Sequence, residues 1–150
     1  MRQFLDRYPN RIPEIYGSFI ALALIVYFLI SYWVGFVHIV ELRLLNFPIL
    51  VTGVYFALKH FERTHDGSLN YFRGLVTGIA TASIGTLTFV VFLYAIFMID
   101  KDLFQSVVKD GPMGAYQNVY LATFAVGIEG VFSGFMATFI LMNFIDTAKT

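Results

Sequence analysis

Glu129 is the residue whose type and position could most directly do chemistry, because it is a carboxylate inside an apolar run. The run is Tyr116–Ile145, and at about 1.5 Å per residue it is long enough to cross a bilayer as one helix. A charged side chain at the bilayer centre costs about 2.5–3.5 kcal/mol on insertion scales. We therefore expect other segments of the chain to shelter Glu129 from lipid, or its carboxyl group to be protonated.

The other apolar runs place polar side chains at a depth similar to that of Glu129, and no Lys or Arg lies mid-span to pair with it. The four polar residues are Tyr27, Thr52, Ser83 and Thr86. In one interpretation a protonated Glu129 hydrogen-bonds to Tyr27 or to a hydroxyl and fixes the helix register. In the other, the cluster is an ion or proton site, because ionisable residues inside membranes often serve function. The sequence leaves both open.

The three histidines are a second candidate for chemistry, as ligands of a metal or haem. His38 lies at the outer end of the first predicted span, while His60 and His65 lie at the inner side of the second. About 30 Å of bilayer core separates these positions, whereas each ligand must lie about 2 Å from a shared metal. His60, Glu62, His65 and Asp66 could meet at the inner surface, but a solvated loop is the favoured interpretation. We predict no metal and no cofactor.

Enzyme chemistry finds no support in the motifs of the chain. The sequence contains no G-x-S-x-G, no H-E-x-x-H and no phosphate-binding loop, and no nucleophile–base pair can be proposed. The chain has no cysteine, which excludes disulfides, cysteine-ligated iron–sulfur clusters and thiolate zinc sites. Its formal net charge is zero, so no basic excess points to nucleic acid. We predict that the protein is not an enzyme and does not bind nucleic acid.

The elements that position Glu129 are predicted to be membrane-spanning helices. Of the 150 residues, 58% are hydrophobic and only 13% are charged, whereas soluble domains have about 25% charged residues. We predict one all-α domain, a bundle of four transmembrane helices over residues 13–37, 42–61, 71–99 and 116–145. The second span is the weakest. If Asn46 caps it, the helix is short, whereas a start near Glu41 gives sufficient length and requires a bend at Pro48.

A short amphipathic helix is predicted between the third and fourth spans, within Asp100–Met113, with Asp102 as its possible cap. Its apolar side chains fall on one helical face and are expected to lie on the membrane. They are Leu103, Phe104, Val107 and Val108.

The orientation follows from the positions of the ten Lys and Arg residues. Seven lie in the N-terminal lead, the second loop and the C-terminal tail, against three on the other side. Positively charged residues concentrate in cytoplasmic segments, so we predict that both termini are cytoplasmic.

Small residues recur at helical spacing in the last two long spans. The third span carries Gly74, Gly78, Ala82 and Gly85, and the fourth carries Gly127, Gly130, Gly134 and Ala137. Such stripes let helix backbones approach closely in lipid, and we interpret them as contacts within the bundle rather than as a dimer interface. At about 100° per residue, Glu129 points about 80–160° away from these residues, towards different neighbours.

The segment ALKHFERTHDGSLNYFRGLVTG, residues 57–78, carries a resemblance to a known family. It resembles an uncharacterised family of small four-helix bacterial inner-membrane proteins, in which a charged loop, a Gly and an aromatic residue lead into a third span with recurring small residues. The resemblance covers Pro13–Ile99 and implies the topology, but it implies no chemistry, since the family has no known function. The matching positions are Lys59, Arg63, Gly67, Tyr71, Phe72, Gly74 and Gly78.

The leading functional hypothesis is a non-enzymatic accessory or assembly subunit of a larger complex in the bacterial inner membrane. Small size, minimal loops and glycine-striped faces fit a protein whose binding surface lies in the bilayer, with lipids and either other membrane subunits or itself as partners. The alternative is a small transporter or channel that uses Glu129, as an oligomer because four spans make a cramped pathway. A membrane enzyme ranks last.

Overall fold

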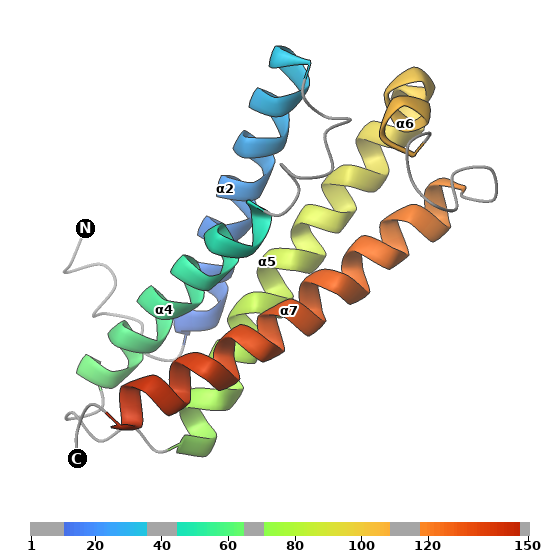
Figure 1. Ribbon diagram of the computed structural model, residues 1–150. Coiled ribbons are helices and arrows are strands. Elements are labelled where there is room, and N and C mark those ends of the chain that lie inside the picture. The colour runs from blue at the N-terminus through green and yellow to red at the C-terminus, as the bar shows by residue number, and fades with distance from the viewer. Residues whose placement is uncertain (1–10, 36–44, 65–70, 109–117, 148–150) are drawn as a thin grey trace.

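The protein is all-helical in the part that the structure, a computed structural model, describes: residues 11–35, 45–64, 71–108 and 118–147. These residues form five helices, α2 (Ile12–Val34), α4 (Asn46–Thr64), α5 (Tyr71–Ile99), α6 (Lys101–Val108) and α7 (Val119–Thr147) (Figure 1). Three of them, α2, α5 and α7, are long and apolar enough to cross a membrane. The chain is therefore an integral membrane protein by length and composition of its helices.

The three long helices form a row with α5 in the middle, and α4 packs across one face of that row (Figure 1). α4 contacts α2, α5 and α7. With 19 residues it is about 28 Å long, whereas α5 and α7, with 29 residues each, are about 43 Å long. α4 therefore covers only part of the row, the part that holds the start of α2 and the end of α7.

The hydrophobic core lies between α4 and the row and continues between α2 and α5 where α4 is absent. Leu50, Val54 and Leu58 of α4 are buried against the row. In the other part, the Phe28 ring makes edge contacts with several rings at centroid distances of 6.1–6.4 Å. Those rings are Phe89, Phe92 and Phe97 of α5.

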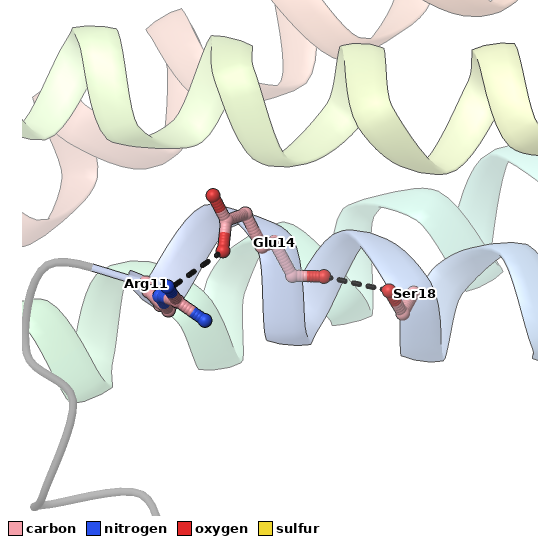
Figure 2. A network of polar contacts seen from close by, with 3 residues as sticks. All are labelled: Arg11, Glu14 and Ser18. Carbon is pink, nitrogen blue, oxygen red and sulfur yellow. Dashed lines mark hydrogen bonds and ion pairs between the residues drawn. The ribbon is translucent and has the colours of Figure 1, made fainter.

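α2 begins and ends with local polar contacts. At its start, Arg11 Nε lies 3.8 Å from the Glu14 carboxylate, and the Ser18 hydroxyl donates to the Glu14 carbonyl (2.8 Å) (Figure 2). At its end, Gly35 adopts the left-handed conformation (φ 80°). Glycine accepts this conformation without strain, so the helix ends at Val34 rather than at the predicted residue 37.

α4 differs most from its predicted range of 42–61. Its first helical hydrogen bond runs from the Ile49 N–H to the Leu45 carbonyl (3.4 Å), and Pro48 occupies the first turn. A proline there removes no hydrogen bond, so no bend is needed. The helix continues to Thr64 through charged residues and is not among the three span-length helices. Glu41, the other start considered, lies outside the described residues.

α6 is capped by Asp100 and not, as the sequence suggested, by Asp102. The Leu103 N–H donates to Asp100 Oδ1 (2.9 Å) and the Tyr32 hydroxyl donates to Asp100 Oδ2 (3.0 Å). These two hydrogen bonds hold the pKa of the Asp100 carboxyl below its ordinary value. The carboxylate thereby links the end of α2 to the start of α6.

The apolar face of α6 packs in part on protein, and its predicted contact with the membrane surface stays a prediction. Leu103 and Val108 are buried, and the Phe104 ring lies 5.6 Å from the Phe97 ring at the end of α5. The end of α5 offers an apolar protein surface one turn away, so part of the face is covered without lipid.

The remaining long helices lie close to their predicted ranges. α5 has the predicted bounds 71–99. α7 starts at Val119 instead of 116, where the Asn118 side chain accepts from the Leu121 N–H (2.8 Å) and caps the helix.

Candidate functional site

The two stripes of small residues meet where α5 packs on α7. A Cβ added to Gly78 would overlap the Thr138 side chain, and one added to Gly134 would overlap Ala82. Ala137 is also buried. Close packing of α5 on α7 therefore depends on the absence of side chains at these glycines.

The small residues of α5 also allow close packing against α2. A Cβ on Gly85 would lie 2.8 Å from Ile20 Cγ2 and 3.1 Å from the Gly17 carbonyl, both on α2. Gly74, at the start of α5, is buried. The small residues thus position α5 against both outer helices of the row.

A pocket of about 220 Å³ opens at the first turn of α4, half way along the bundle. Its walls come from all four long elements, and four of its ten lining residues are polar. The polar residues are Asn46, Thr86, Glu129 and Ser133, and the others are Leu24, Phe47, Leu50, Phe89, Val126 and Gly130.

Glu129 lies at the rim of this pocket with its side chain exposed. Within the described part of the chain it makes neither a hydrogen bond nor an ion pair. Its neighbours Ile128 and Phe132 are 56% and 63% exposed, so the carboxylate sits on an apolar surface. In the described part of the chain no helix covers the Glu129 side chain, since α4 begins at Asn46, and the two alternatives for this carboxyl, shelter by the chain or protonation, stay predictions.

Thr86 forms the buried wall of the pocket. It is 3% exposed, and its hydroxyl has no hydrogen-bond partner among the described residues. Seven other hydroxyls in the long helices and α4 donate to the carbonyl four residues earlier, those of Ser18, Ser31, Thr52, Thr64, Thr81, Thr123 and Thr138. An unpaired buried hydroxyl costs about 1–3 kcal/mol, and Thr86 is a residue at the pocket that carries this cost.

Of the predicted polar cluster, the structure brings Glu129 and Thr86 to one pocket and leaves the other members apart. Thr52 is exposed, donates to the Pro48 carbonyl (2.7 Å) and lines a separate groove of about 560 Å³ between α2 and α4. Tyr27 and Ser83 are half-buried and line neither cavity.

Two pocket residues were missed by the sequence reasoning. Ser133 follows Glu129 by four residues, and that spacing puts both on one face of a helix, so it could have been found. Asn46 was considered only as a cap, because its distance from Glu129 depends on where α4 begins.

His60, one of the histidines considered as a metal ligand, lies away from the pocket at Glu129, near the start of α2. His60 Nδ1 lies 3.4 Å from the Tyr16 hydroxyl, which joins α4 to α2 near the start of α2. No group of three metal-binding side chains forms within the described ranges. His38, His65 and Asp66 lie outside them.

The comparisons with known proteins agree with the resemblance seen in the sequence. Residues 15–145 match a family described as "Protein of unknown function (DUF4199)". The chain belongs to this family. The match extends beyond Ile99, where the resemblance in the sequence ended, and includes α7 with Glu129. Curated proteins and solved structures give no match to the chain.

In this DUF4199 chain, the chemistry available to the pocket is binding. It holds one carboxylate, two hydroxyls and one side-chain amide on mainly apolar walls. All four groups can accept hydrogen bonds. The arrangement suits a group that carries positive charge and several donors.

Proposed function

We propose that this protein is a non-enzymatic subunit of a larger membrane complex in the bacterial inner membrane. The observation that carries the proposal is the exposed Glu129 carboxylate, ten residues after the start of α7, with no partner among the described residues of its own chain. Lipid cannot solvate a carboxylate, so such a group in a membrane is expected to meet another protein.

The surroundings of Glu129 support contact with a protein. The same flank of α7 exposes large apolar side chains, among them Leu121, Phe132 and Met136. α7 is an outer helix of the row, so this flank is accessible to a neighbouring transmembrane helix.

The proposal includes four spans with both termini in the cytoplasm. α4, although short, would be the second span, with its charged end at the cytoplasmic surface beside the start of α2. The excess of Lys and Arg in the N-terminal lead, the second loop and the tail supports this orientation.

A small oligomeric transporter or channel is the second candidate, and the pocket is the observation that favours it. Thr86 and Ser133 lie with Glu129 around one cavity, as in a site that binds an ion. This function requires flux through an oligomer, whereas the first requires a foreign partner.

Native mass determination after gentle extraction from the native membrane tests the two. A stoichiometric foreign protein, lost in Glu129→Leu and retained in Ile128→Leu, supports the subunit. Ile128 is the matched control because it is the exposed apolar neighbour of Glu129. A homo-oligomer without foreign protein contradicts the proposal, and cation flux by that oligomer in vesicles would establish the second candidate.

A further inference from the structure

We propose that the pocket at Glu129 receives the ammonium group of a lysine carried on a transmembrane helix of a different protein. This inference rests on the proposed role as a subunit and names the chemistry of the partner. Four observations carry it: the size of the pocket, its acceptors, the unpaired Thr86 hydroxyl, and the positions of the chain's own cations.

The pocket has the size of one side-chain head group. Its volume of about 220 Å³ equals that of about seven water molecules at about 30 Å³ each. Pockets for drug-sized ligands hold about 300–1,000 Å³. A drug-sized cofactor is larger than this pocket, whereas the end of a lysine side chain fits.

The acceptors match a lysine. An ammonium group has three donors and no acceptor, and the pocket offers the Glu129 carboxylate, two hydroxyls and the Asn46 amide oxygen. These groups come from three different helices, α4, α5 and α7, so they surround the cavity rather than share a plane. A compact ammonium suits that arrangement better than a planar guanidinium, whose donors need coplanar acceptors.

The Thr86 hydroxyl is the independent sign that the pocket takes a polar group. It is buried and unpaired among the described residues, although it could bond its own helix as seven other hydroxyls do. Gly130, opposite on α7, lets the Thr86 side chain pack closely against α7: a Cβ there would lie 2.5 Å from Thr86 Cγ2 and 3.0 Å from Thr86 Oγ1. A donor that enters the pocket would complete the hydrogen bonding of Thr86.

A second copy of this chain cannot supply the lysine from the described helices. Lys59 lies thirteen residues after Asn46, and Arg73 lies thirteen residues before Thr86, each about 20 Å along its helix. In a two-fold dimer through this face, moreover, each Glu129 would approach the other Glu129. The described helices thus offer no cation at this depth, and the partner that we propose is a different protein with a lysine near the middle of a span.

The experiment uses the full-length protein in phosphatidylcholine vesicles and a synthetic Leu/Ala transmembrane helix with one central lysine as the probe. Energy transfer between labels on protein and peptide reports binding. The same helix with methionine in place of the lysine is the control peptide. We expect the lysine peptide to bind at least about tenfold more tightly than the methionine peptide, as hydrogen bonds to a charged group imply.

Three variants locate the binding. Glu129→Gln should abolish the preference for lysine, and Thr86→Val should weaken lysine binding about threefold or more. Thr52→Val, which removes a hydroxyl outside the pocket, should bind like wild type. Circular dichroism confirms that each variant keeps its helices before binding is compared.

Equal binding of the two peptides, or a lysine preference that survives Glu129→Gln, overturns the inference. Competition by ethylammonium at equal concentration would show that the site takes a free amine, and this too overturns it. The outcome is separable from the proposed function: a foreign partner without a mid-span lysine leaves the subunit role standing and refutes the lysine site alone.

Discussion

Thr86 and Glu129 are two polar residues of one pocket that differ in their burial. The Thr86 hydroxyl is enclosed by protein and has no partner among the described residues, whereas the Glu129 carboxylate is exposed among apolar side chains. The first can be replaced by an apolar group of equal shape. Under the proposed function, the carboxylate is where a partner brings charge or a donor.

Thr86→Val is expected to keep or raise the stability of the isolated protein, because valine has the same shape and removes an unpaired hydroxyl. The gain should be about 1–2 kcal/mol. Thr81→Val is the matched control: Thr81 is equally buried, but its hydroxyl donates to the Thr77 carbonyl (2.7 Å), so this variant should lose about 0.5–1 kcal/mol. Unfolding in mixed micelles measures both. A greater loss in Thr86→Val than in Thr81→Val would contradict the assignment.

The sequence was sufficient to find Glu129 and Thr86 but not to predict their surroundings. A carboxylate in an apolar run is visible in any sequence, and depth along a helix follows from residue number. Whether α4 covers that carboxylate depends on the residue at which α4 begins, and the two possible starts differ by about one helical turn. Asn46 and Pro48 were compatible with two starts, so the exposure of Glu129 could not be deduced.

Among the elements, α6 shows how one carboxylate can hold two helices together. Asp100 caps α6 and accepts from Tyr32 of α2. Sequence reasoning found the apolar face of α6 but predicted only its contact with the membrane, because nothing in the sequence shows that the end of α5 lies beneath it. The cap was predicted at Asp102 because the sequence does not show that α6 begins only one residue after the end of α5.

Asp100→Ala is expected to loosen α6 while the long helices remain intact. The measurement is amide hydrogen exchange over Lys101–Val108, corrected for intrinsic rates, with Asp102→Ala as the control that leaves the cap in place. Because the pKa of Asp100 is lowered in the folded protein, its contribution is complete above the ordinary carboxyl pKa of about 4 and is lost as the pH falls through the lower folded value. Protection of α6 that does not change in Asp100→Ala would refute this role.

Gly78→Leu and Gly134→Leu are expected to destabilise the packing of α5 on α7 by about 1–3 kcal/mol or more, because each side chain would overlap the facing helix. Gly127→Ala is the control on α7, where an added Cβ meets only Val90 at 3.6 Å, and it should be neutral or stabilising. Thermal unfolding in detergent gives the comparison. Wild-type stability in both leucine variants would mean that the stripes do not pack as described.

For the whole molecule, composition and helix length were enough to predict three long helices, and the family match covers nearly the whole chain. The fourth element could not be predicted with the same ease. α4 combines an apolar start with a charged end, Lys59 to Arg63, so its length as a span depends on residues at both ends.

The orientation is testable with reporter fusions. A reporter joined after Lys149 is expected to be active only in a form that works in the cytoplasm, because seven of the ten Lys and Arg residues lie on that side. A reporter inserted at Asp66-Gly67 should behave in the same way. Periplasmic activity at either site would reverse the predicted topology.

The short length of α4 also determines the outline that the molecule presents to the two leaflets of a bilayer. α4 adds a helix to the row only in the part that holds the start of α2, so the described bundle is wider there and occupies more area in the leaflet around the start of α2. In a curved bilayer the lipids of the outer leaflet are less densely packed than in a flat one. A protein that is wider in that leaflet fills the additional area. We expect the protein to partition into small, strongly curved vesicles over large ones in a single inserted orientation, and sorting of labelled protein by vesicle diameter would measure it. An equal density at all diameters would show that other parts of the chain, or a bound partner helix beside α4, make the outline cylindrical.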